Sequence, residues 1–111
     1  MGGGAFMGLC SKLAGVRTFE EALELAAKSS QTHCDLTTRD MLGDELCARM
    51  PAIGGDYTVS LFCPLALDDP KRTASVVPAD LARSLVYMTA HHCAELAYLF
   101  CLMEVCDIIC K

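Results

Sequence analysis

The chain has 111 residues, a formal net charge of −5, and a composition that is 53% hydrophobic and 21% charged. This length fits one domain, and so apolar a composition excludes an intrinsically disordered chain. Tight binding to nucleic acid needs a basic surface, and the acidic balance argues against it because Lys71 and Arg72 are the only adjacent basic residues.

Membrane and secretory segments are not expected. The longest apolar candidate, residues 96–110, is interrupted by Glu104 and Asp107 and is too short for a membrane span. The first residues lack the charged and apolar regions of a secretory signal. A cytoplasmic protein without a membrane partner is therefore expected.

Three consecutive glycines open the chain as a predicted loop that leads into a predicted helix over residues 5–14. Glycine lets another group approach the main chain closely, and the N–H groups at a helix N-terminus bind anions. Glycines near a terminus are more often a flexible leader or a cloning remnant, and the residues alone favour that interpretation. Gly2, Gly3 and Gly4 are the candidate cofactor-binding residues only through the family resemblance described below.

Local signals define the first two predicted helices. Gly15 is well placed to end the first helix in the left-handed conformation. Thr18 and Glu21 form a capping-box pattern at the start of a second helix, which is predicted to reach about residue 29.

The remainder of the chain contains a third, short helix and a fourth, long one. The third is predicted over residues 36–42 and ended by Gly43. Residues 50–73 are mostly predicted loop, and the apolar run 57–62 fits either strand or helix. The long helix begins at Pro78 and runs to about residue 103, because Pro suits the first helical position and a broad apolar face follows.

The end of the chain, residues 105–110, reads VCDIIC. This short run with β-branched residues predicts a mostly buried strand. A lone terminal strand has no partner, so we expect its sheet neighbours to be missing from these residues.

The eight cysteines have no paired-framework spacing, and we interpret them as reduced, buried apolar residues. Metal binding through the histidines and cysteines near the C-terminus is the less favoured alternative. His91 and His92 would point to different sides of a helix. Cys106 and Cys110 would lie about 13 Å apart in a strand. No metal ligand is therefore assigned.

Four acidic residues, Asp35, Asp40, Asp44 and Glu45, offer a second possible metal cluster. Acidic side chains around short helices more often cap helix ends or face water. Caps and solvated surface are therefore the favoured interpretation.

The motifs, taken in order, resemble the eukaryotic-type (type II) pantothenate kinases. The first is GGGAF at residues 2–6, with Ala5 where threonine is usual in the family. The later matches, in family order, are GLC at 8–10, the helix at 18–27, Asp35 followed by RDMLG at 39–43, PADLARSL at 78–85, AYL at 97–99 and the segment 105–110. The resemblance covers almost the whole chain.

This resemblance implies that residues 1–111 are one partial domain, a segment of the second lobe of such a kinase. The implied fold is an α-rich fragment of an α/β actin-like (sugar-kinase-type) fold, with several helices, one long helix and a short C-terminal strand. In that architecture two lobes close over ATP. The glycine turn would then face the phosphates of a nucleotide or of coenzyme A.

The implied activity of the parent enzyme is ATP-dependent phosphorylation of pantothenate in coenzyme A biosynthesis, with Mg²⁺. By resemblance, the catalytic carboxylate, the first phosphate-binding turn and the pantothenate contacts precede the triple glycine. No catalytic residue is therefore assigned, and the isolated chain is expected to be inactive. Acyl-CoA is a further candidate ligand of the parent, and a homodimer is a candidate assembly.

Three segments depart from the family pattern. Residues 59–63 read VSLFC in place of an ASSFG-type segment, 91–94 read HHCA in place of NNIG, and 48–57 match poorly. These departures leave open an alternative function, a non-catalytic degenerate module that acts through contact between its apolar surface and another protein or a second copy. A redox or metal-binding protein is a more distant alternative.

Overall fold

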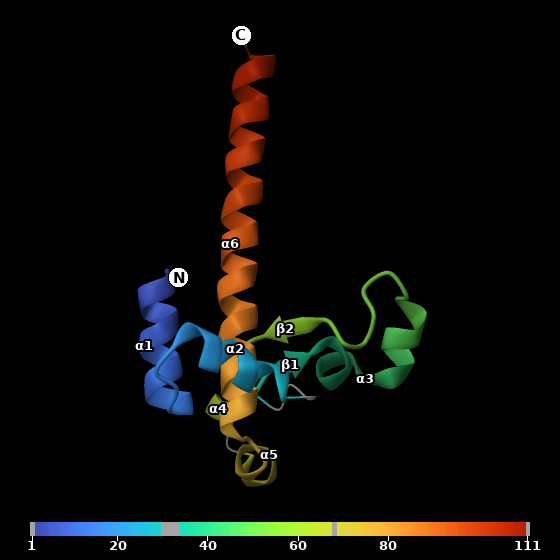
Figure 1. Cartoon of the computed structure of the whole chain (residues 1–111). Helices are drawn as coiled ribbons and strands as arrows, with labels where there is room; N and C mark the ends of the chain where they lie inside the picture. The colour runs from blue at the N-terminus through green and yellow to red at the C-terminus, as the bar shows by residue number, and fades with distance from the viewer. Residues whose placement is uncertain (1, 30–33, 68, 111) are drawn as a thin grey trace.

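The residues that the structure describes are mainly helical, with one small two-stranded sheet (Figure 1). The computed structural model describes residues 2–29, 34–67 and 69–110. In chain order the elements are α1 (Gly3–Ala14), α2 (Phe19–Ala27), β1 (Leu36–Thr37), α3 (Thr38–Arg49), β2 (Thr58–Ser60), α4 (Cys63–Ala66), α5 (Pro70–Ala74) and α6 (Pro78–Ile109).

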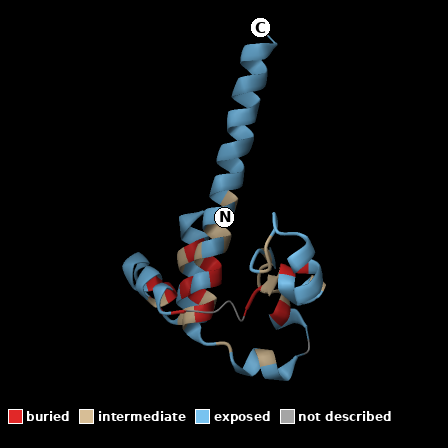
Figure 2. Ribbon diagram, turned by 90° about the vertical axis from the view of Figure 1, so that its right-hand side faces the viewer, coloured by how far each residue is buried: buried red, intermediate tan, exposed pale blue. Residues whose placement is uncertain are grey.

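Helix α6 is the axis of the structure. Helices α1 and α2 pack against its first half, and the sheet with α3 lies to one side (Figure 1). Its second half projects away from the body, and every residue from 93 to 110 is exposed (Figure 2). The apolar cluster that joins α1, α2 and α6 therefore lies around the first half of α6.

The apolar cluster between these helices is small. Its buried members are Phe6, Cys10, Val16, Ala22 and Leu85. They come from α1, the turn after it, α2 and α6, so the hydrophobic effect holds these helices together by burying one face of each.

The predicted end of the first helix and the predicted start of the second are confirmed by their capping geometry. Gly15 follows α1 in the left-handed conformation, with φ 72°. At the start of α2, Thr18 and Glu21 form the reciprocal capping box, in which the Glu21 N–H donates to Thr18 Oγ1 at 3.2 Å. Helix α2 ends at Ala27, close to its predicted end.

Gly15→Ala should lower the free energy of unfolding by about 1 kcal/mol, because a β-carbon is strained at positive φ. Gly8→Ala is the matched control within α1, since the added β-carbon meets nothing within 4 Å. That change should instead stabilise by up to about 1 kcal/mol through helix propensity. Urea unfolding measures both, and shifts of the same sign and size would contradict this account.

The middle of the chain holds more structure than predicted. Strands β1 and β2 pair antiparallel, with Leu36 opposite Ser60, so the unassigned run 57–62 contains a strand. Helix α3 begins at Thr38 and leaves helical geometry at Gly43, with φ 76°, as the glycine indicated. It then resumes to Arg49 instead of ending there.

The predicted C-terminal strand at residues 105–110 is wrong, because α6 continues through Ile109. Helical hydrogen bonds satisfy this backbone locally, whereas a strand would need a neighbour, and in the described part of the chain only β1 and β2 pair. The helix-propensity penalty of a β-branched residue is below about 1 kcal/mol, so continued helix is the less costly outcome.

The prediction that the cysteines are buried is correct for part of the set only. Cys10, Cys34 and Cys47 are buried and Cys63 is half-buried. The other four lie exposed along α6, at positions 93, 101, 106 and 110. None of the eight is paired in a disulfide.

Helix α6 is long, but length alone does not make a membrane span. Within residues 2–29, 34–67 and 69–110, no helix combines the length and the apolar character needed to cross a bilayer.

Candidate functional site

The glycine turn forms the start of α1 rather than a preceding loop. The helix begins at Gly3, two residues before its predicted start, and Gly2 is its N-cap in an extended conformation. The first intrahelical bond runs from the Phe6 N–H to the Gly2 carbonyl at 3.0 Å. Gly3 and Gly4 therefore lie in the first turn, where backbone N–H groups have no intrahelical acceptor.

This N-terminus is open to an anion from solution. Gly2, Gly3 and Gly4 are exposed, and a β-carbon added at any of them would meet no atom within 4 Å. No side chain caps the turn, and its first residues include no acidic group. The helix dipole adds partial positive charge at this end. The geometry therefore fits a phosphate approached by backbone donors.

Phe6 fixes the turn to the body of the protein. Its side chain is 2% exposed and belongs to the core cluster. Its ring meets that of Phe19 edge to face, with centroids 5.7 Å apart. Since only Ala5 separates Phe6 from the glycines, the turn is held in place by the packing of α1 against α2 and α6.

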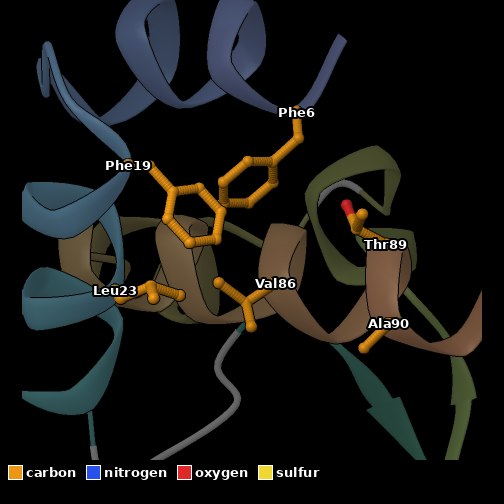
Figure 3. Close-up of a pocket in the computed structure, with 6 residues that line it drawn as sticks. All are labelled: Phe6, Phe19, Leu23, Val86, Thr89 and Ala90. Carbon is orange, nitrogen blue, oxygen red and sulfur yellow. The ribbon is translucent and has the colours of Figure 1, made fainter. Parts of the chain in front are cut away.

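A pocket of about 180 Å³ lies beside Phe6, between α1, α2 and α6 (Figure 3). It is lined by Phe6, Phe19, Leu23, Val86, Thr89 and Ala90. The only polar side chain, Thr89, donates its hydroxyl proton to the Leu85 carbonyl at 2.9 Å, within its own helix. The wall is otherwise carbon, so the pocket suits an apolar group.

Asp35 is a buried carboxyl group that joins three parts of the chain. It is 1% exposed. Ser84 Oγ of α6 donates to its Oδ2 at 2.8 Å, and the Phe62 N–H donates to its Oδ1 at 3.2 Å. The guanidinium of Arg72 donates to the Asp35 backbone carbonyl at 2.8 Å. Asp35 therefore ties the segment before β1 to α6 and to the left-handed Phe62, whose φ is 56°.

A second buried carboxyl group lies near the first. Asp80 is 3% exposed, accepts from Ser29 Oγ at 2.7 Å, and accepts from the Val77 N–H at 3.1 Å, which caps α6. Burial of Cys34 disfavours its thiolate form, and the negative charges of the nearby Asp35 and Asp80 disfavour it further. Together they raise the pKa of the Cys34 thiol to about 11. The Cys34 thiol is therefore protonated and unreactive at neutral pH.

The four acidic residues proposed as a possible metal cluster are separated by the structure. Asp35 is buried, while Asp40 accepts from the Thr37 N–H at 2.8 Å as a helix cap. Asp44 is paired with Arg39 at the surface, and Glu45 is exposed. No group of three or more His, Cys, Asp or Glu in the described ranges is arranged to hold a metal ion.

Sequence reasoning missed the residues that complete the buried cluster. The capping role of Asp80 could have been predicted, because an acidic residue two positions after a helix-starting proline commonly caps the helix. The pairing of Asp35 with Ser84 could not, since 49 positions separate the two residues. It is fixed only when β1 and α6 come together.

The stability of the protein should depend on pH through Asp35. Burial raises the pKa of this carboxyl group above its usual value of 3.8. The folded state therefore holds the proton more tightly than the unfolded state does. The resulting stabilisation is complete below the unfolded pKa and is lost as pH rises through the folded pKa.

Comparison with Asp35→Asn isolates this effect, since the amide does not titrate. As the pH rises from about 3 to about 7, the free energy of unfolding of the parent should decrease relative to that of Asp35→Asn. Urea unfolding across this range measures the difference. A constant difference, or one of opposite slope, would contradict a raised pKa.

Comparison with known proteins places the chain among characterised relatives. A model of the protein family Fumble matches residues 1–110. The chain is 30% identical over 99 residues to pantothenate kinase 1 of Arabidopsis thaliana, an alignment that covers 89% of this chain and 25% of that protein. It is 27% identical over 99 residues to pantothenate kinase of Schizosaccharomyces pombe, over 89% of this chain and 24% of the relative.

A relative with a different named activity matches equally well. The chain is 28% identical over 100 residues to 4'-phosphopantetheine phosphatase of Mus musculus, which covers 90% of this chain and 12% of the mouse protein. The chain thus spans a quarter or less of the length of these relatives.

Proposed function

The chain belongs to the Fumble family, as its resemblance to the pantothenate kinases predicted, and we propose that it is a segment of a pantothenate kinase that supplies one wall of the nucleotide site. The whole enzyme would phosphorylate pantothenate with ATP and Mg²⁺, in coenzyme A biosynthesis and in the cytoplasm. Acyl-CoA remains a candidate ligand of that parent enzyme. The actin-like fold of the parent belongs to the same proposal.

The observation that carries this proposal is the open N-terminus of α1. Gly2, Gly3 and Gly4 offer backbone donors without a side-chain cap, and the buried ring of Phe6 holds them in place. Phosphoryl transfer depends largely on positioning and on neutralising charge, which such a turn supplies. The named activities of the relatives, a kinase and a phosphatase, both concern phosphate esters.

The proposed contribution is binding and not the chemical step. The carboxyl groups buried among the described residues, Asp35 and Asp80, are already held by hydrogen bonds. We therefore assign no general base to the described residues. Purified alone, the chain should give no pantothenate-dependent production of ADP.

A graft tests the proposal directly. The 99 residues matched in pantothenate kinase 1 of Arabidopsis thaliana would be exchanged for the corresponding residues of this chain. The folded chimera should bind ATP, and Gly3→Val with Gly4→Val should weaken that binding because β-branched side chains cover the donors. A folded chimera that binds ATP with the same affinity with and without these two substitutions would contradict the proposed role of the turn.

The exposed half of α6 favours a second candidate function, a non-catalytic module that binds a partner protein or a second copy. The large exposed side chains of this half are Leu96, Tyr98, Leu99, Phe100, Leu102, Met103, Val105, Ile108 and Ile109. Apolar patches of this kind commonly mark interaction surfaces.

Sedimentation of the purified chain tests this candidate. Self-association that is abolished by Phe100→Glu, on the exposed half of α6, would favour it. A monodisperse monomer that binds no dye for exposed apolar surface would count against it.

A further inference from the structure

The helical structure of the C-terminal segment brings two exposed cysteines one turn apart. The Cys110 N–H donates to the Cys106 carbonyl at 2.9 Å, the bond that joins residues four apart in a helix. Residues at this spacing have β-carbons about 5–6 Å apart, whereas in a strand they would lie about 13 Å apart. Both thiols are exposed. Cys106 and Cys110 therefore present their sulfur atoms on one face of α6.

A third sulfur lies on the same face. Met103 is one turn before Cys106, and its side chain is 63% exposed. A shallow hollow on α6 is lined by Leu99, Leu102, Met103, Cys106 and Asp107. The thioether and the first thiol thus border one hollow, and the second thiol follows one turn further along the helix.

The cysteine pair is unsuited to an internal disulfide. A disulfide needs β-carbons about 3.5–4.5 Å apart, closer than neighbours on successive helical turns. A bridging metal ion suits a wider separation of the two β-carbons than a disulfide does. Two metal–sulfur bonds of about 2.3 Å, the length found for zinc, let the sulfurs lie up to about 4.6 Å apart, whereas the S–S bond of a disulfide is about 2.0 Å long. The spacing therefore favours a bridging ion over a covalent bond.

We propose that Met103, Cys106 and Cys110 form a binding site for a single copper(I) ion. Thiolate and thioether ligands select soft ions such as copper(I). Zinc usually takes four ligands from Cys, His and carboxylates, and the described residues contain no group of three such side chains. On binding, each thiol releases one proton and forms one copper–sulfur bond, and the metal keeps its oxidation state.

Competition for copper tests the site in the full chain. The reduced protein is titrated without oxygen into copper(I) buffered by bathocuproine disulfonate, whose coloured complex bleaches as the protein takes up copper. The parent should remove one equivalent. Cys106→Ser and Cys110→Ser should each lose this tight equivalent, and Met103→Leu should weaken it without changing its stoichiometry.

The other exposed cysteines provide the matched control. The double variant Cys93→Ser, Cys101→Ser keeps the proposed ligands and should bind copper(I) as the parent does. All of these positions are exposed, so the helical circular dichroism should be unchanged. A Cys106→Ser variant that keeps the equivalent, a control variant that loses it, or zinc binding of equal strength would overturn the proposal.

Sedimentation of the copper-loaded protein separates a site within one chain from one shared between chains. We expect the mass of the copper-free protein. A copper-dependent dimer would contradict a site formed by three side chains of one helix.

Discussion

Asp35→Ala should lower the free energy of unfolding by about 3 kcal/mol, the usual cost of breaking a buried, hydrogen-bonded polar group. The variant leaves the Ser84 hydroxyl without its carboxylate acceptor and the Phe62 N–H without its partner. Because Ser84 is fully buried, water cannot easily replace the lost contact. Urea unfolding monitored by circular dichroism measures the change.

The matched control is Asp44→Ala, which removes a surface carboxylate whose side chain is 79% exposed. Surface ion pairs contribute about 0–1 kcal/mol, so this variant should remain close to the parent. Equal losses from both variants would show that the buried position of Asp35 has no special role.

Leu85→Ala should cost about 2–5 kcal/mol, because it opens a cavity where α1, α2 and α6 meet. Leu85 is 1% exposed and is the largest fully buried side chain described. Its core cluster has few members, so the neighbouring helices have little other apolar area to hold them against α6. The packing of α1, which holds the glycine turn, against α6 should therefore weaken in Leu85→Ala as well.

Leu96→Ala is the control on the same helix, since Leu96 is 53% exposed. Its loss should change the free energy of unfolding by less than about 0.5 kcal/mol. Thermal or urea unfolding compares the two variants. Similar values would mean that the first half of α6 does not carry the core.

Local signals predicted the elements whose boundaries depend on neighbouring residues. Gly15 ended α1 and the Thr18 capping box began α2, because both devices act within a few residues. Pro78 began the long helix for the same reason. The glycines were predicted as a loop that leads into the helix, whereas the structure places Gly3 and Gly4 in its first turn.

Contacts between distant segments were beyond the reach of sequence reasoning. The Asp35–Ser84 bond and the closeness of Cys34 to Asp80 depend on how the region before β1 meets α6. The end of α6 was mistaken for a strand because residues 105–110 have β-branched side chains. Propensity alone decides little when no strand lies alongside.

Chemical shifts of the backbone amides give the most direct test of the proposed phosphate-facing turn. In the ¹⁵N-labelled chain, titration with Mg²⁺–ADP should shift the Gly3, Gly4 and Ala5 signals saturably, because these N–H groups lie in the first turn of α1. The Gly54 and Gly55 signals should stay in place, and Gly4→Asp should weaken the response by charge repulsion. Shifts confined to Lys71 and Arg72, or no saturable shift at the α1 N-terminus, would contradict the account.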